Sequence, residues 1–466
     1  MRRNGLTPVL GAALLLCCAQ AQAQTRPRTL NDALASAYST NPALQAARAQ
    51  LRSIDENVSQ ALAGWRPTII FSTGIGYADG TVRAPFQGIS TVSRNNRNIF
   101  SEQASLTQPL YRGGQTRATT SQTTNQVFAQ RGRLQSSEQQ LFTDTISAFV
   151  GVIQAQQLLQ LNISNEQVLA RQLQATNDRF RVGEITRTDV AQAEAALAGA
   201  RAQRQQSEGT LATSRATYFR TVGEMPDRLV EPQPIKLPIR TQNEAAQLAS
   251  QNNPNVIAAL FDDAAARDSI DVAFSQLMPQ VSLQATAART DNTATPRTRG
   301  IGGQVLLNAS VPIYQGGAEY SRVRQARQVA QQTRRTVDDT RRGAVQIASL
   351  AWENLATART TIDSTRAQIR ANQIALEGVQ REAIVGSRTT LDVLNAEQAL
   401  LISRGTLVQN LSNLVTASYA VASAIGRLTA RDLNLDVALY DETAYYNAVR
   451  DRLFGTGDYA VTQPGR

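Results

Sequence analysis

Histidine and cysteine, two of the side chains most often used in catalysis, are nearly missing from this chain of 466 residues. Histidine is absent, and the two cysteines, Cys17 and Cys18, lie within the first 23 residues. The rest of the chain therefore lacks the commonest general base, the commonest metal ligands and a thiol nucleophile. No arrangement of Asp and Glu pairs indicates a hydrolase. We expect a protein that is not an enzyme, with no catalytic, cofactor-binding or metal-binding residues.

The most regular arrangement of polar residues occurs in two similar turns. The sequence VGEITRTDV begins at Val182, and VGSRTTLDV begins at Val385. In each turn the glycine is suited to end a helix, because it adopts a left-handed backbone without strain. The Thr-x-x-Asp pattern that follows is typical of the start of the next helix. Capping alone is therefore one possible role for both aspartates.

The first residues predict a secreted protein. Basic residues at positions 2 and 3 precede an apolar stretch, Val9 to Leu16, and Ala21-Gln22-Ala23 forms a small-x-small cleavage site. We expect residues 1–23 to be a signal peptide. No later stretch approaches the roughly 20 apolar residues that a membrane helix needs. If the mature chain crosses a membrane, it must therefore cross as β-strands.

The mature chain is basic, but its charge pattern is not that of a nucleic-acid-binding protein. The net charge of +10 becomes +8 when Arg2 and Arg3 leave with the signal peptide. The remaining arginines are scattered among Gln, Ala and Thr rather than clustered with aromatic side chains. We expect no nucleic-acid partner.

The chain contains two copies of one unit. Asn41-Pro42 recurs as Asn253-Pro254, at a separation of 212 residues (254 − 42), and PLYRGG recurs as PIYQGG at a separation of 203 (312 − 109). The Val-Gly turns keep the second offset, so the first copy carries a loop nine residues longer (212 − 203). We expect repeat 1 over 24–225, a proline-rich linker over 226–241, repeat 2 over 242–427, and a tail over 428–466. We expect part of this tail to be equatorial, that is, to lie around the middle of the molecule's length, and the rest to be disordered.

Each copy contains two segments with the alternation of a β-strand. In the first copy these run from Ile69 to Tyr77 and, after a polar loop, from Phe100 to Leu110. In the second copy they run from Val281 to Ala287 and from Ile301 to Ile313. Each segment has about ten residues, the length of a tilted membrane strand.

Four strands cannot close a barrel, and an open sheet edge cannot face lipid. Closure must come from other chains. A homotrimer would supply twelve strands (3 × 4), whereas a dimer would supply eight and leave little lumen. We expect a trimer, although strand arithmetic alone permits a dimer or tetramer.

Three aromatic residues of the strands are candidates for the girdles that mark the two surfaces of a membrane: Tyr77, Phe100 and Tyr111. Ordinary packing within the sheet is the alternative role for them.

Each copy also predicts helices far longer than those of a globular protein. No proline occurs between Gly114 and Pro226, or from Pro312 until the last residues. One helix over residues 114–181 would be about 100 Å long. The returning segment of the second copy carries apolar residues at intervals of seven, the spacing of a coiled-coil seam, and Arg204 interrupts the matching column of the first copy. The column in the second copy is Val393, Leu400, Leu407, Leu414 and Val421.

The two Tyr-x-Gly-Gly junctions and the two Val-Gly turns, twice over in this order, resemble those of the TolC-type outer-membrane efflux and secretion channels. The resemblance covers roughly residues 28 to 430. It implies an α+β membrane protein in which a trimeric twelve-stranded β-barrel, with four strands per chain, continues into a long α-helical coiled-coil periplasmic tunnel. The location implied is the cell outer membrane, with an extension into the periplasm.

The function implied by the resemblance is the passive exit duct of a tripartite efflux pump or a type I secretion system. Its implied partners are two further copies of the chain, outer-membrane lipid, a periplasmic adaptor protein and an inner-membrane transporter, either ABC-type or proton-driven. We expect such a channel to use no cofactor. The segments LYDE and YYNAVR of the tail resemble those of members that serve protein-secreting transporters, and they favour secretion over drug efflux by a small margin.

By resemblance, the Val-Gly turns form a periplasmic tip that is closed at rest. Arg388 would pair with Asp189 or Thr188 of the neighbouring coil and help to latch the tip, and three copies of Asp392 would form a ring that favours cations. The tip and gate residues that we predict are Gly183, Thr188, Asp189, Gly386, Arg388 and Asp392.

Two features of the tip depart from the family pattern. Asn395 stands where some relatives carry a second aspartate, and Ala383 stands where an aromatic residue can support the latch.

A periplasmic adaptor is the alternative class of protein, since adaptors also combine helical hairpins with β structure. Strands of membrane length in both copies favour the channel.

Overall fold

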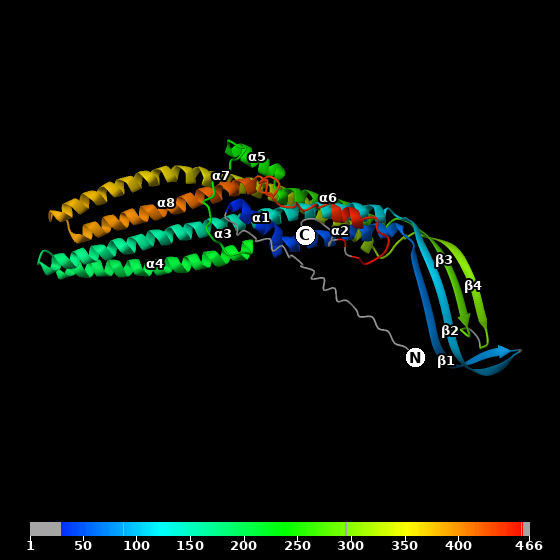
Figure 1. Cartoon of the computed structure of the whole chain (residues 1–466). Coiled ribbons are helices and arrows are strands. Elements are labelled where there is room, and N and C mark those ends of the chain that lie inside the picture. Colours follow the sequence, from blue (N-terminus) through cyan, green and yellow to red (C-terminus); the bar gives the residue numbers. More distant parts are fainter. Residues whose placement is uncertain (1–28, 87, 294–295, 458, 460–466) are drawn as a thin grey trace, which may run out of the picture.

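In the computed structural model, which describes residues 29–86, 88–293, 296–457 and 459, both repeats follow one order of elements (Figure 1). The predicted signal peptide lies outside these residues. The first repeat comprises α1 (Leu30–Thr40), α2 (Pro42–Leu62), β1 (Thr68–Phe86), β2 (Ile89–Arg112), α3 (Gln115–Arg181) and α4 (Arg187–Val222). The second comprises α5 (Gln242–Asn252), α6 (Pro254–Ser275), β3 (Gln280–Asp291), β4 (Arg299–Ser310), α7 (Ala318–Ile384) and α8 (Thr390–Ala424). A short helix, α9 (Ala444–Val449), follows them.

The repeated Asn-Pro pairs begin corresponding helices, and each asparagine also hydrogen-bonds to the end of another helix. Asn41 and Asn253 cap α2 and α6 through their side-chain oxygens, and a proline takes the first helical position of each. The amide nitrogen of Asn41 also donates to the carbonyl oxygen of Thr221, at the end of α4, over 3.0 Å. That of Asn253 donates in the same way to Ala424, at the end of α8, over 3.2 Å. Each repeat thereby fastens its returning helix to its own first half.

The four strands form one antiparallel sheet in the order β1-β2-β3-β4. Its register aligns Ile69 with Leu106, Leu106 with Ala285, and Ala285 with Val305. Since residues directly opposite each other lie on the same face, the four predicted apolar series share one face of the sheet. The prediction of four strands per chain is confirmed. Within the described residues, β1 and β4 are the outer edges.

The first hairpin is longer than the sequence predicted. The polar loop expected between Tyr77 and Phe100 is instead strand, and β1 and β2 pair continuously to Phe86 and Ile89 around Gly88, whose φ is +82°. An Asp79–Arg94 ion pair of 3.2 Å joins the two strands there. This segment is rich in polar residues, so period-two alternation of apolar residues failed to reveal it, although hydrogen bonds pair its two strands. In the second copy the strand predicted to reach Ile313 ends at Ser310.

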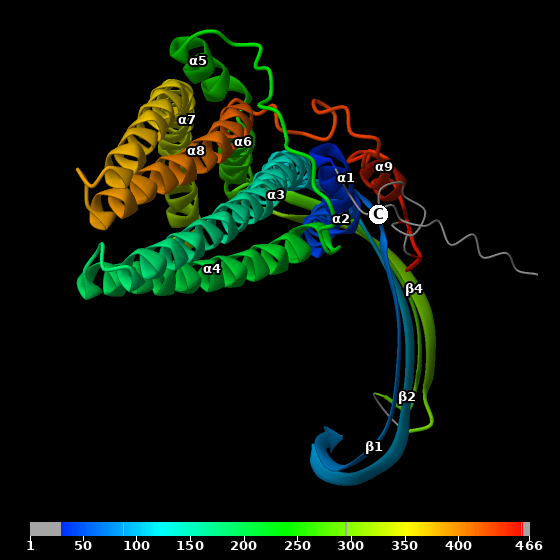
Figure 2. The ribbon, with the colours of Figure 1, turned by 60° about the vertical axis from the view of Figure 1, so that its left-hand side comes forward.

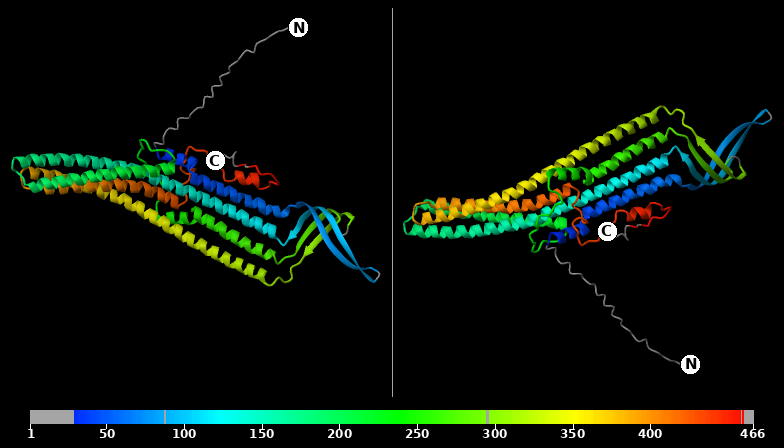
Figure 3. Two further views of the ribbon diagram at one scale, coloured as in Figure 1. Left: turned by 90° about the horizontal axis from the view of Figure 1, so that it is seen from below. Right: turned by 90° about the horizontal axis from the view of Figure 1, so that it is seen from above.

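The long helices pair as two hairpins that lie side by side and point away from the sheet (Figure 3). The predicted long helix over residues 114–181 is confirmed as α3, and α7 has the same length of 67 residues. Each is therefore about 100 Å long. In the seam of α8, Val393, Leu400 and Val421 are buried, whereas Leu407 and Leu414 are half-buried. Arg204, which interrupts the matching seam, forms ion pairs with Glu166 over 2.7 Å and Glu208 over 2.8 Å.

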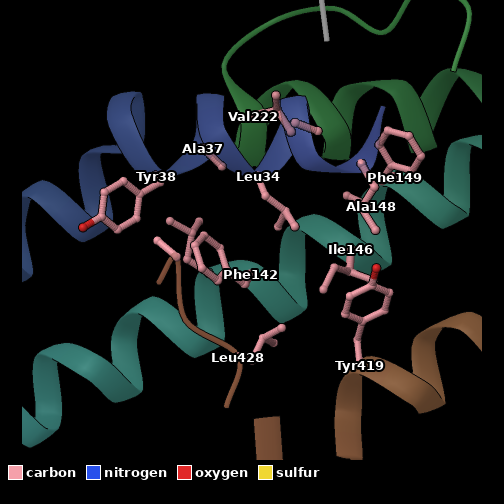
Figure 4. Packing of buried hydrophobic residues seen from close by; sticks show 14 of the residues in the cluster. Leu34, Ala37, Tyr38, Phe142, Ile146, Ala148, Phe149, Val222, Tyr419 and Leu428 are labelled. Carbon is pink, nitrogen blue, oxygen red and sulfur yellow. The ribbon is translucent and has the colours of Figure 1, made fainter. Parts of the chain in front are cut away.

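The largest core lies where the hairpins meet the shorter helices. Leu34 of α1 and Phe142 and Phe149 of α3 are fully buried there, and Leu428 joins them from the C-terminal tail (Figure 4). Tyr445 of α9 donates to Glu56 of α2 over 2.9 Å. Leu428 and α9 therefore form part of the body of the protein. Among the described helices, none combines the length and apolar character needed to span a membrane.

Candidate functional site at the hairpin tips

The first tip is the turn between α3 and α4. Val182 is the C-cap of α3, and Gly183 follows it with φ +82°. The amide of Gly183 donates to Phe180, and that of Glu184 to Arg179, each over 3.0 Å. These two bonds satisfy carbonyl groups that the end of the helix leaves without partners. The side chains of Arg179 and Glu184 form an ion pair of 3.0 Å across the same turn.

The second tip, between α7 and α8, repeats this backbone with the charges exchanged. Gly386 has φ +80°, and the amide of Ser387 donates to the carbonyl oxygen of Glu382 over 3.0 Å. Glu382 corresponds to Arg179 of the first tip (382 − 179 = 203). Its carboxylate accepts a hydrogen bond of 2.9 Å from Nε of Arg388. Each tip thus holds its own ion pair within one chain.

Both predicted capping boxes are present. The carboxylate of Asp189 accepts bonds from the backbone amide and hydroxyl of Thr186, over 3.0 and 2.7 Å. Asp392 and Thr389 form the same bonds, over 3.0 and 2.8 Å. Hydrogen bonding to the hydroxyl and amide of Thr186 lowers the pKa of Asp189, and bonding to the amide and hydroxyl of Thr389 lowers that of Asp392. Both side chains are therefore negatively charged at neutral pH.

The fold brings all six predicted tip residues to one end of the molecule, opposite the sheet (Figure 1). Thr188 and Arg388 are exposed, whereas the two aspartates are half-buried and bond to their own turns. Arg388 lies against Glu382 of its own chain. The pairing of Arg388 with Asp189 or Thr188 of a neighbouring coil stays a prediction, because that contact would form between coils of an assembly.

The tip also carries an apolar surface that the sequence alone did not predict. Val182, Ile384 and Val385 are 71, 81 and 78% exposed, although the turns hold them in place. The available signal was the apolar residue directly before each glycine. Exposed apolar side chains that cluster at one end of a molecule are typical of an interaction surface. We define Val182, Ile384 and Val385 as the apolar tip.

Replacing either tip glycine with alanine should destabilise the protein. A left-handed backbone costs an L-residue roughly 1–2 kcal/mol, so we expect losses of about that size per chain for Gly183→Ala and for Gly386→Ala. Gly209 is the matched control, because it is exposed and helical, and a Cβ added there would meet no atom within 4 Å. Gly209→Ala should be neutral or stabilising by about 0.5–1 kcal/mol. Thermal unfolding in detergent tests this; equal midpoints for all three variants would contradict it.

The chain that forms these long paired helices and the four-stranded sheet matches one known protein family. The model of the outer membrane efflux protein family matches residues 33–224 and 245–427. This chain belongs to that family. It is 35% identical over 428 residues to the outer membrane efflux protein BepC of Brucella suis, covering 92% of this chain and 91% of BepC. It is 26% identical to the outer membrane protein TolC of Escherichia coli, over 84% of this chain and 81% of TolC.

The fold also agrees with a solved relative. The outer membrane protein VceC of Vibrio cholerae superposes with a TM-score of 0.73 at 19% identity, covering 85% of this chain and 96% of VceC. As a member of the outer membrane efflux family, the present chain is an exit duct of the outer membrane that extends into the periplasm. The predicted class of function and location are confirmed, and the adaptor alternative is set aside.

Proposed function

We propose that three copies of this chain form one passive duct. The observation that carries this is a four-stranded sheet with two open edges, built on helices about 100 Å long. Lipid cannot satisfy the backbone groups of an open edge, so β1 of one chain would pair with β4 of the next. Twelve strands would then close the barrel, and the six hairpins would surround the periplasmic tunnel. The duct itself carries out no chemical reaction and uses no cofactor.

The proposed partners dock at the opposite end from the barrel. The apolar tip supports the binding of a periplasmic adaptor protein, through which an inner-membrane transporter, ABC-type or proton-driven, delivers cargo and supplies energy. BepC is named an efflux protein, which supports efflux as a role of this duct. The likeness of the tail to those of secretion channels supports protein cargo as well.

An export assay tests docking at the tip separately from channel formation. Cells that lack this protein should accumulate an amphiphilic dye, and the wild-type gene should restore export. The double variant Ile384→Asp, Val385→Asp should fail to restore export, because charge would be buried against the adaptor, yet it should still conduct in planar bilayers. Full restoration of dye export by this variant would contradict docking at the apolar tip.

We also propose that Arg388 helps to latch the tip between neighbouring chains. Arg388→Ala should raise the open probability of single channels about threefold to tenfold, the size expected for three weak surface contacts on a nearly balanced gate. Arg187→Ala is the control, since Arg187 is an exposed arginine at the other tip. Glu382→Gln separates the two roles of Arg388. It would free Arg388 for the neighbouring chain and lower the open probability; a rise equal to that of Arg388→Ala would show that only the bond within one chain matters.

A further inference from the structure

The chain after α9 forms an ordered turn that holds two apolar side chains in solvent. Arg452 organises it, because its Nε donates to Phe454 over 3.1 Å and one of its terminal nitrogens donates to Gly457 over 2.9 Å. The guanidinium also lies 4.5 Å from the ring centroid of Tyr459. Leu453 is 71% exposed and Phe454 is 87% exposed on this turn. We call residues 452–457 the C-terminal turn.

The C-terminal turn is fastened at the level where the sheet begins. A terminal nitrogen of Arg66 donates to the carbonyl oxygen of Arg452 over 2.7 Å, and Arg66 stands two residues before β1. Trp65 is 51% exposed at the same level, and Tyr111, near the end of β2, is 48% exposed. Tryptophan and tyrosine at the ends of barrel strands are typical of the boundary between membrane and water.

The side of the molecule on which the tail lies also favours lipid. The C-terminal segment with α9 lies on the side of the convex face of the sheet, whereas the lumen of a barrel is on the concave side (Figure 2). The apolar series on the sheet starts directly beyond this level with Ile69 and Phe71, which are 72 and 67% exposed. Leu453 and Phe454 therefore continue the apolar band that faces the outer-membrane lipid.

We infer that the C-terminal turn is an interfacial anchor whose partner is the phospholipid of the periplasmic leaflet of the outer membrane. Leu453 and Phe454 enter the boundary between headgroups and acyl chains, and Arg452 and Arg66 lie beside lipid phosphates. Because α9 also binds α2 through Tyr445 and Glu56, the anchor joins the helical body to the bilayer outside the barrel.

Quenching by brominated phospholipids tests this directly. Trp65 and Trp352 are the only tryptophans, so replacing both with phenylalanine gives a background for one new tryptophan. In the full-length protein reconstituted in phosphatidylethanolamine and phosphatidylglycerol vesicles, Phe454→Trp should lose half or more of its fluorescence to lipids brominated near the headgroup. Ile384→Trp is the control at the periplasmic tip, where the native side chain is 81% exposed. It should be quenched by aqueous acrylamide and unaffected by bromolipid.

Two outcomes would overturn the anchor. If the tryptophan of Phe454→Trp is quenched by acrylamide but not by bromolipid, as at the tip control, the turn lies in water. If neither quencher lowers its fluorescence, the turn lies against protein, either an adaptor or a neighbouring chain. Single-channel conductance of the same samples confirms that each variant is folded, so a failed anchor remains distinguishable from a failed duct.

Discussion

Arginine in place of Val305 is expected to prevent stable insertion of the protein into the outer membrane. Val305 lies within β4, on the apolar face of the sheet and opposite Ala285. A charged side chain on the lipid face near the middle of the bilayer costs about 2–4 kcal/mol, which three symmetric copies would raise to about 6–12 kcal/mol. The membrane-bound fraction and the amount of trimer on native gels are the quantities to measure.

Gln304→Arg is the matched control for this prediction. Gln304 is the preceding residue of β4 and pairs with Thr286, so its side chain lies on the opposite face. The variant should insert normally and shift ion selectivity towards anions, because the new charge would lie in the lumen. Equal insertion of Val305→Arg and Gln304→Arg would show that the two faces of the sheet have been assigned wrongly.

The second large effect concerns stability and pH. Asp55 of α2 is fully buried, and neither of its carboxylate oxygens has a hydrogen-bond partner within the described residues. Burial raises the pKa of Asp55 from 3.8 to about 7, and the opposing effect of Arg131 is smaller. The folded protein therefore binds this proton more tightly than the unfolded chain. Its stabilising contribution is complete below the unfolded pKa of 3.8 and is lost as the pH rises through 7.

Asp55→Asn should remove this pH dependence. At pH 8 the native carboxylate costs at most about 4 kcal/mol per chain, so the variant should unfold at a higher temperature than the wild type. At pH 4 the gain should nearly vanish. Asp144→Asn, at an exposed position of α3, should leave the pH profile of the unfolding temperature unchanged. A constant difference between Asp55→Asn and the wild type from pH 4 to 8 would contradict the assignment.

The parts of the fold that the sequence predicted are those where one physical requirement acts on many residues. One apolar face of the sheet produced the alternation from Ile69 to Tyr77, and packing of α8 against α7 produced the column from Val393 to Val421. Beyond Tyr77 the first hairpin is rich in polar residues, so no regular apolar alternation remained to reveal its strands. The turn around Arg452 rests on bonds from one side chain to backbone groups, which residue types alone do not indicate.

The candidate site was predictable only in part, for a related reason. Gly183, Gly386 and the two Thr-x-x-Asp boxes act within a few residues, so their local roles could be predicted from spacing. The partner of Arg388 is chosen among several carboxylates by geometry, and the fold places Glu382 against it. The latch depends on where neighbouring coils lie, and the sequence of one chain does not determine that distance.

The proposed assembly is tested most directly by planar-bilayer conductance of the purified, detergent-extracted protein, with the oligomeric mass determined on the same sample. The expected result is a trimer that gives small, cation-selective openings, because twelve strands form the pore and three copies each of Asp189 and Asp392 carry negative charge at the closed tip. A monomer that shows no conductance would contradict the duct.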